Sequence, residues 1–415
     1  MDPSHASTRI HRASYVYAAG VGAFAVLAAV VLLADNDDVL RAFGFDLMPE
    51  RWADACTISG AGIALDQGLD PLVENPGDPW GRVLNYPRIW LLPARLGLRP
   101  EHTPVLAASF LLAGLAGLLS LRHLGRERNT AWILLLGAMA PTTWFAAERA
   151  NSDLLMFGLV AWACVRASSH PRLAVVLTAI ASLLKLYPIA GVAALLGHER
   201  RATWRRVTPL LVAFAAYTWA IGGDLRRIYE GTASAPHLAY GVRNMPTWLA
   251  ENTDVPFAGW LALMCLALVG VLVAAVRIRR SRRLGESGSA ASQAAFRAGA
   301  AIYLCTFLVG ECFDYRLLFL LLTIPQLCAW AATGTRRVRR LAAIMLGIVL
   351  LLQWSLCWRQ ILASALGTRT TGLAIDECLS WFAWCGFAML GTLSLPDGAL
   401  PQSFGSARYL DENPT

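Results

Sequence analysis

The sequence predicts an all-α protein that crosses a membrane many times. Of its 415 residues, 56% are hydrophobic and only 15% are charged, whereas an ordinary soluble chain is about 25% charged. The apolar residues form segments rich in leucine and alanine, and a spanning helix needs roughly 20 such residues. Inside a bilayer the backbone must satisfy its own hydrogen bonds, so helices are expected. The net charge of +8 comes from arginines in short loops, and nucleic acid is not expected as a partner.

Twelve apolar segments are predicted within a single integral membrane domain, residues 1–415. They lie near residues 14–35, 104–121, 130–147, 152–167, 172–184, 187–197, 207–222, 257–278, 298–312, 316–333, 341–357 and 374–394. The first segment follows a short basic stretch and is longer than the apolar region of a cleaved signal peptide. It is therefore expected to remain as the first span.

Arginine clusters in the short loops set the predicted orientation. Such clusters are expected on the cytoplasmic side, here a bacterial inner (plasma) membrane. They occur around Arg126, Arg166, Arg201, Arg279 and Arg337. Both termini are then cytoplasmic, as is a linker over 279–297. The extracytoplasmic loops are predicted at 36–103, 147–152, 223–256, 313–315 and 358–373.

A short broken hairpin is required between Arg172 and Arg200. Both residues should be cytoplasmic, so the chain between them must cross the membrane an even number of times. Two short segments that meet at Lys185–Pro188 satisfy this condition, because proline disfavours helix at the preceding residue. Such a hairpin reaches only part of the way across a bilayer, and its freed carbonyl groups need a polar pocket.

The first extracytoplasmic loop, 36–103, contains the richest set of polar residues. A helix that begins at Asp54 and ends near Gly68 is expected to lie along the membrane surface. Asp54 is either a general base or an ordinary acid in the first turn of a helix, where the helix dipole favours a carboxylate. The loop continues with Asp70-Pro71 and Asn85-Tyr86-Pro87-Arg88.

Lys185 is the only lysine among the 36 lysine and arginine residues. It lies between apolar stretches, directly before Tyr187-Pro188, where a cation is expensive unless it faces a polar cavity or a partner. An ammonium at this position could hold a phosphate as a point charge. The alternative is a side chain that extends to the nearer membrane interface.

Two short outer turns and one longer loop carry further candidates. In the turn Glu148–Asp153, Arg149 could serve an anion and Asp153 could face the pocket of Asp54, or Asn151 could simply cap the next helix. In the turn at Asp314-Tyr315-Arg316, the charges form either an internal ion pair or a phosphate or sugar site. The loop 223–256 is either a sugar-stacking lid or an ordinary loop; its candidates are His237, Tyr240, Arg243 and Trp248.

Three of these motifs together resemble glycosyltransferase family 87, a branch of the polytopic GT-C transferases. The first is Asp54 followed by Gly68 and Asp70-Pro71, although Leu72 stands where the family usually has an aromatic residue. The second is the turn Asn151-Ser152-Asp153, and the third is Lys185-x-Tyr187-Pro188. The motifs occur in the family's order and on the expected side of the membrane.

The resemblance implies an inverting transfer of a hexosyl or pentosyl unit on the extracytoplasmic face, with a mannosyl unit as the first candidate. The donor would be a polyprenyl-phosphate sugar that enters from the membrane lipid, and the acceptor a lipid or a glycan. Asp54 would deprotonate the acceptor hydroxyl, and neither a cofactor nor a metal is expected. The expected substrate-binding residues are Lys185, Tyr187, Arg149, Asn151, Asp153, Asp70, Tyr86, Arg88, Asp314 and Arg316.

Two other classes of function stay open at this point. A transporter or lipid flippase would have matching halves and a site at the midplane. The chain has no evident internal repeat, and one half is far more polar than the other. The remaining hypothesis is a membrane protein that serves as a structural partner and whose active site has decayed.

Overall fold

A computed structural model describes residues 3–34, 37–45, 47–124, 127–197, 199–281 and 287–396. The side chains of residues 3–12, 280 and 281 are not among the described parts. The centre of the predicted cytoplasmic linker, 282–286, and the C-terminal segment from residue 397 lie outside these ranges.

The chain is almost entirely helical. The α-helices are α1 Pro3–Leu33, α2 Asp37–Ala42, α3 Ala53–Asp66, α4 Leu91–Arg95, α5 Thr103–Ser120, α6 Arg128–Ala138, α7 Pro141–Glu148, α8 Asp153–Arg166, α9 Pro171–Leu184, α10 Arg200–Ala220, α11 Gly222–Glu230, α12 Asn244–Asn252, α13 Phe257–Ser281, α14 Ala290–Val309, α15 Ile324–Thr333, α16 Arg336–Gln353, α17 Ser355–Leu366 and α18 Thr370–Ser394. The 3₁₀ helices are η1 Arg88–Trp90, η2 Pro100–His102, η3 Leu121–His123, η4 Tyr187–Leu195, η5 Pro236–Leu238 and η6 Asp314–Thr323. Two short strands, β1 Ala239–Tyr240 and β2 Cys312–Phe313, pair in an antiparallel manner.

Six helical segments of the described ranges are long and apolar enough to cross a membrane. They are α1, α5, α13, α14, η6 with α15, and α18. Two bent pairs, α6 with α7 and α16 with α17, raise the number to eight if each pair counts as one span. The chain is therefore a multi-pass all-α membrane protein, and the count of twelve segments stays a prediction.

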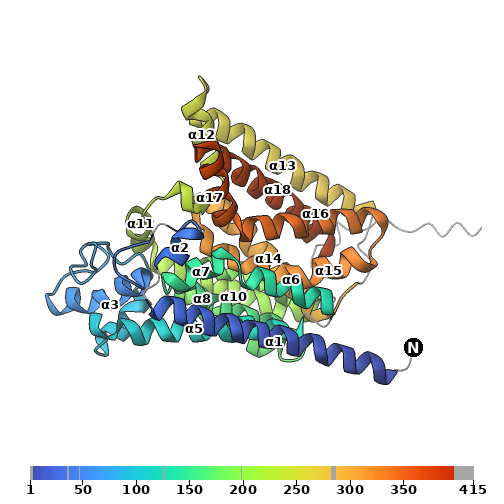
Figure 1. The fold of residues 1–415 in the computed structure, drawn as a ribbon, viewed down its shortest axis with the longest axis horizontal. Coiled ribbons are helices and arrows are strands. Elements are labelled where there is room, and N and C mark those ends of the chain that lie inside the picture. Colours follow the sequence, from blue (N-terminus) through green and yellow to red (C-terminus); the bar gives the residue numbers. More distant parts are fainter. Residues whose placement is uncertain are drawn as a thin grey trace, which may run out of the picture.

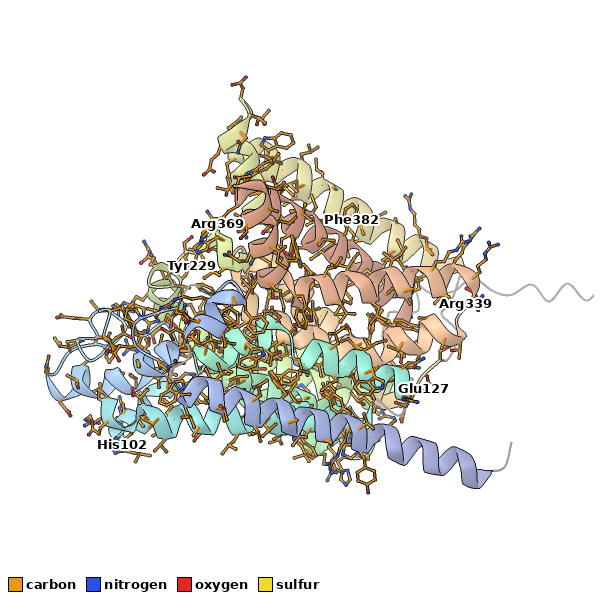
Figure 2. All side chains as sticks on the ribbon, in the orientation of Figure 1. His102, Glu127, Tyr229, Arg339, Arg369 and Phe382 are labelled. Carbon is orange, nitrogen blue, oxygen red and sulfur yellow. The ribbon has the colours of Figure 1, made fainter. Side chains whose placement is uncertain are left out.

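The helices run between two opposite ends of the molecule, which carry different elements (Figure 1). The N-terminal end of α1 lies at one end, and α3 with its flanking loops lies at the other. Figure 2 places Glu127 and Arg339 at the end where α1 begins, and His102 at the opposite end. The labelled arginine-rich loops thus gather at one end, as the sequence predicts. The assignment of that end to the cytoplasm stays a prediction.

The outer faces of several helices expose large apolar side chains. In the most apolar stretch of α13, only 11% is buried inside the protein. Leu263 and Leu266 of this helix are exposed. Trp219 on α10 is 89% exposed. A soluble monomer rarely leaves such continuous apolar surface in water, whereas a bilayer solvates it. These faces are consistent with contact to lipid.

Two unusually long 3₁₀ helices begin next to the predicted site. Runs of 3₁₀ helix longer than three or four residues are uncommon, yet η4 has nine residues and η6 has ten. Neither was predicted: 187–197 was expected as one arm of the short broken hairpin, and 316–333 as an apolar segment. Both pack against α14, where Gly299 permits a close approach because an added Cβ would lie 2.8 Å from the carbonyl oxygen of Phe319.

The predicted break before Pro188 is present. Helix α9 ends at Leu184, and Lys185 is extended, with φ −141° and ψ 142°. Two carbonyl groups near this end of α9 have side-chain donors: the indole of Trp90 donates to Leu184 over 2.8 Å, and the hydroxyl of Tyr217 donates to Leu183 over 3.0 Å. The polar environment that the break requires is therefore supplied by neighbouring side chains.

Helix α3 begins where the sequence predicts, but it is largely enclosed by protein. Its small residues let a loop approach closely: an added Cβ at Gly60 would lie 2.5 Å from the carbonyl carbon of Gly77. Gly60 and Ala61 are both buried, so this helix has no simple division into an apolar face and a polar face. Its placement along the membrane surface stays a prediction.

The contact between Gly60 and Gly77 yields a stability prediction. We expect Gly60→Ala to lower the stability of the folded chain by about 1–3 kcal/mol, because a methyl group forced against packed backbone must displace it. Thermal unfolding in detergent measures the effect. Gly22→Ala on α1 is the matched control, since no atom lies within 4 Å of the added Cβ. Equal melting temperatures for the two variants would contradict this account of the packing.

Candidate active site

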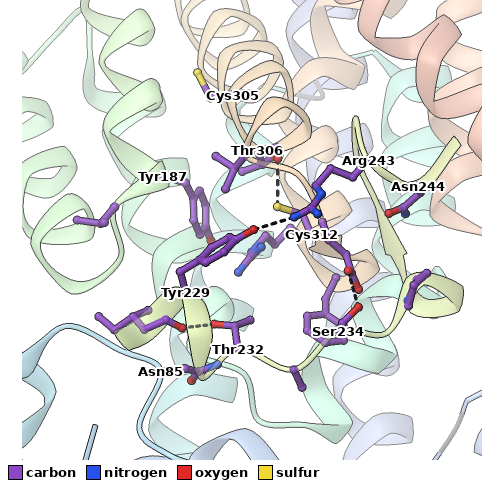
Figure 3. A pocket seen from close by; sticks show the side chains of 18 of the residues that line it. Asn85, Tyr187, Tyr229, Thr232, Ser234, Arg243, Asn244, Cys305, Thr306 and Cys312 are labelled. Atoms are coloured by element: carbon purple, nitrogen blue, oxygen red, sulfur yellow. Dashed lines mark hydrogen bonds between the residues drawn. The ribbon is translucent and has the colours of Figure 1, made fainter. Parts of the chain in front are cut away.

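A cavity of about 1300 Å³ opens where the hairpin break, the first turn of η6 and the loop 223–256 meet (Figure 3). Its wall includes Tyr86, Lys185, Tyr187 and Arg316. These four were predicted as substrate-binding residues from separate parts of the sequence, and the fold brings them together. Much of the remaining wall is apolar, with side chains such as Phe214, Ile228 and Val309.

Asp54 lies beside Asn151, although 97 residues separate them in the chain. The side-chain amide of Asn151 donates a hydrogen bond of 2.5 Å to one carboxylate oxygen of Asp54. The other carboxylate oxygen lies 3.4 Å from the guanidinium of Arg82. The N-cap of α3 is Trp52, with no side-chain capping bond. Asp54 thus uses its carboxylate for contacts with distant residues rather than for capping its own helix.

Lys185 is buried and points at the same asparagine. Its ammonium donates to the side-chain oxygen of Asn151 over 3.1 Å and forms a short ion pair with Asp153. It also lies 5.0 Å from the centre of the Tyr86 ring, a cation–π contact. These polar partners account for a lysine between apolar segments.

Arg316 approaches Asp153 from the opposite side. Its Nε lies 3.3 Å from the second carboxylate oxygen of Asp153, and its guanidinium carbon lies 5.3 Å from the ring centre of Tyr187. Asp153 is fully buried. Two cations therefore share one buried carboxylate, and the three charges sum to +1. That excess charge stands at the wall of the cavity, where an anion would be stabilised.

Two strained backbone positions lie next to the Asp54–Asn151 contact. Trp52 (φ 59°) and Ala150 (φ 43°) are the non-glycine residues with positive φ in the described ranges. They directly precede the segments that carry Asp54 and Asn151. The amide of Asp54 donates to the carbonyl of Arg149 over 3.1 Å, which ties the two segments together. Backbone strain of this kind persists only where the surroundings enforce it, and here it fixes the Asp54–Asn151 contact.

Arg82 is a site residue that the sequence analysis missed. It pairs with Asp78 over 2.8 Å and stacks on Trp80, 4.7 Å from the ring centre. Asp78 is itself buried and accepts a hydrogen bond of 2.8 Å from Thr57. An arginine 28 residues after Asp54 carries no local signal of this role, because the contact depends on how the loop folds back over α3.

Two predicted substrate-binding residues have partners elsewhere. Asp314 accepts a hydrogen bond of 2.8 Å from Arg359, so it belongs to a buried ion pair, one of the two readings of its turn. Arg149 pairs with Glu148 over 3.1 Å. Neither Asp314 nor Arg149 is part of the cavity wall in the described structure. Asp54, Asn151 and Asp153 stand behind the wall and reach it through Lys185.

Asp70 and Arg88 form a link between the first outer loop and α11. Arg88 contacts both carboxylate oxygens of Asp70, at 3.1 and 2.8 Å, and its Nε donates to Asp224 over 2.8 Å. Arg227 also contacts Asp70, over 3.0 Å. These four side chains join two loops at the rim and lie outside the described wall of the cavity.

This link should weaken in acid. Hydrogen bonds from Arg88 hold the pKa of Asp70 below its ordinary value of 3.8. A carboxyl group with a lowered pKa stabilises the fold above its ordinary pKa, and the contribution disappears as the pH falls through the lowered value. We expect a contribution of about 1 kcal/mol or less, because the pair is partly exposed. Melting temperatures of the wild type and of Asp70→Asn should differ at pH 6, and the difference should shrink as the pH falls below 3.8; a constant difference would contradict this.

The loop 223–256 covers one side of the cavity. His237, Arg243 and Trp248 line it, whereas Tyr240 is buried and stacks on Tyr303, with 5.3 Å between ring centres. Figure 3 shows the guanidinium of Arg243 bonded to Tyr229, a contact of 2.7 Å. Three of the four predicted lid residues therefore face the cavity, and the fourth belongs to the core.

Residues 91–296 match glycosyltransferase family 87; the match includes Asn151 and Lys185, whereas Asp54 and Arg316 lie outside it. No curated protein matches the chain. Among solved structures, the chain is similar to ArnT from Cupriavidus metallidurans in the apo state, with 14% identity and a TM-score of 0.38, over 88% of this chain and 77% of that chain.

Proposed function

We propose that this chain, a membrane glycosyltransferase of the GT-C type that resembles glycosyltransferase family 87, transfers a hexosyl or pentosyl unit with inversion. The donor is a polyprenyl-phosphate sugar, the class that GT-C enzymes use. The acceptor is a lipid or a glycan on the extracytoplasmic face of a bacterial inner membrane. A mannosyl unit is the first candidate, on the strength of the family resemblance alone.

One observation carries the proposal: a carboxylate is joined through a single asparagine to Lys185, which lines the cavity together with Arg316. Asp54 accepts from Asn151, and Asn151 in turn accepts from Lys185. This supports a base on one side of Asn151 and phosphate-binding cations on the other. Such an arrangement suits attack on the sugar from the face opposite its leaving group.

The reaction follows from these positions. The acceptor oxygen attacks C1 of the sugar, the bond between C1 and the phosphate oxygen breaks, and polyprenyl phosphate leaves. Asp54 takes the proton from the acceptor hydroxyl, a step that contributes about 10²–10⁴ in rate in typical enzymes. Lys185 and Arg316 stabilise the negative charge that develops on the phosphate. The reaction releases an anion that the cations already face.

The apolar part of the cavity suits a lipid-linked donor. Phe214 and Thr218 on α10 face it from one side, and Cys305 and Val309 on α14 from another. Val309 is 65% exposed. A prenyl chain in the surrounding lipid could therefore contact this wall while its phosphate reaches Lys185.

A donor comparison tests the proposal. Membranes that carry the chain should transfer labelled sugar from polyprenyl-phosphate mannose or from polyprenyl-phosphate arabinose into a lipid or glycan product. Nuclear magnetic resonance should find the product anomer opposite to that of the donor. Direct use of a nucleotide sugar, or retention of configuration, would contradict the proposal. Movement of intact donor across the vesicle without cleavage would favour a flippase instead.

A further inference from the structure

A second cavity, of about 380 Å³, lies beside the first and shares His237 and Leu373 with it. Its wall comes from α2, the segment 44–47, α17 and the start of α18. Among the described residues that line it, the hydrogen-bonding side chains are Arg41, His237, Arg359, Gln360 and Arg369. Its volume falls within the range of small-molecule sites, about 300–1000 Å³. The proposed transfer leaves it unused.

The strongest donor in this wall is held in a fixed orientation. Arg359 is buried, and it donates to Asp314 and to Asp376, each over 2.8 Å. A guanidinium has five N–H donors in a planar fork, and these two bonds use two of them. Arg359 also forms part of the cavity wall. Such a fork suits two neighbouring hydroxyl groups as well as it suits a carboxylate.

The charges around this cavity are compensated. Two carboxylates face Arg359, and Arg41 pairs with Asp37 over 3.1 Å and with Asp38 over 3.5 Å. The wall therefore offers many hydrogen-bond donors with little excess positive charge, in contrast to the wall at Lys185 and Arg316. The apolar side chains of Phe45, Leu47 and Leu356 complete it. A neutral ligand with several hydroxyl groups and C–H faces fits this mixture better than an anion does.

The first turn of η6 connects the two cavities. Asp314 orients Arg359 at the second cavity, and Arg316, two residues later, faces the first. A ligand in the second cavity would thus lie next to the cation that holds the donor phosphate. The two cavities are therefore neighbours, joined by this turn and by the shared His237 and Leu373.

On the basis of the proposed transfer, we propose that the second cavity binds a sugar residue of the acceptor. The acceptor is then a glycan or a glycolipid, and the hydroxyl groups of its terminal sugar accept hydrogen bonds from Arg359, Gln360 and Arg369. Arg359, which is held in a fixed orientation, positions that sugar relative to the donor cavity.

Saturation-transfer difference NMR on the full chain in detergent tests this proposal. Methyl α-D-mannoside should receive saturation from the wild type, and the double variant Gln360→Leu/Arg369→Leu should reduce the signal at least fivefold. Arg369 is exposed and Gln360 partly exposed, so the variant should fold. The matched control, Arg226→Leu on α11, removes an exposed arginine outside the cavity and should leave the signal unchanged. No glycoside signal, or a signal that survives the double variant, would overturn the proposal.

Two further arms identify what binds and separate this proposal from the transfer itself. Glycerol 1-phosphate should compete poorly with the glycoside; efficient competition that the double variant abolishes would overturn the sugar assignment in favour of an anionic group. Asp54→Asn should lose transfer and keep the glycoside signal. If the wild type binds the glycoside through this cavity and yet performs no transfer from any polyprenyl-phosphate sugar, the proposed function fails while the sugar site stands.

Discussion

Replacing Asp54 with asparagine should reduce the rate of sugar transfer by about 10²–10⁴, the usual contribution of a general base. Asparagine has the same shape and can still accept the hydrogen bond that Asn151 donates to position 54. The fold and the donor cavity should therefore persist, and the loss should appear in kcat rather than in the KM for the donor. Transfer of labelled sugar from a polyprenyl phosphate, measured at saturating donor, gives both constants.

The matched control lies on the same helix. Asp66, at the C-terminal end of α3, pairs with Arg99 over 2.7 Å and is more exposed than Asp54, with side-chain exposures of 57% and 17%. Asp66→Asn should leave kcat within about twofold of the wild type, because surface pairs contribute little. If Asp54→Asn retains wild-type activity, Asp54 is not the base.

Replacing Lys185 with methionine should lower kcat by about 10²–10³, the typical effect of removing one group that stabilises developing charge. It should also raise the KM for the donor, because the ammonium faces the phosphate before and during the reaction. The folded chain should lose less than the roughly 3–5 kcal/mol of an uncompensated buried charge, because Arg316 still pairs with Asp153. Transfer kinetics and thermal unfolding in detergent measure the two effects.

The conservative variant separates charge from shape. Lys185→Arg keeps a positive charge but places a wide planar fork among Asn151, Asp153 and Tyr86, where the compact ammonium fits. We expect partial activity, between that of the wild type and that of Lys185→Met. Equal activities for Lys185→Met and the wild type would show that the phosphate is held without Lys185.

The parts of the fold that follow from local sequence were predictable. Leucine- and alanine-rich segments indicated helices, and the distribution of arginine required a break before Pro188, which occurs at Lys185. A helix starting at Asp54 was also expected, and α3 starts one residue earlier, at Ala53. Each of these features depends on composition or on a local backbone rule, so a single chain reveals it.

The contacts that bring the site residues together depend on the tertiary fold. They could not be predicted from the spacing of these residues in the sequence. Asp54 meets Asn151 because strained backbone at Trp52 and Ala150 ties two loops together. Arg82 reaches Asp54 only because its loop folds over α3 at the Gly60–Gly77 contact. Conversely, Asp70 and Arg88 were grouped with the site from their position in the loop, and they link the loop to α11 instead.

Helix α17 shows the same limit at the level of secondary structure. The segment 358–373 was predicted as an outer loop, but α17 continues to Leu366 and is bent by 71° from α16. Hydropathy alone did not reveal α17, because this helix lies outside the most apolar stretch of its region. Its first turns supply Leu356 and Arg359 to the second cavity, so the missed helix also concealed a candidate binding site.

The solitary lysine beside Tyr86 gives this protein a built-in spectroscopic probe. Because Lys185 is the only lysine of the chain, labelling lysine with ¹⁵N at Nζ would produce one ammonium resonance, free of overlap even in a large micelle. The ring current of Tyr86, 5.0 Å away, should displace that resonance from the position of a solvated lysine. The same signal would then follow the arrival and departure of a phosphate in real time, with no need to introduce a foreign label.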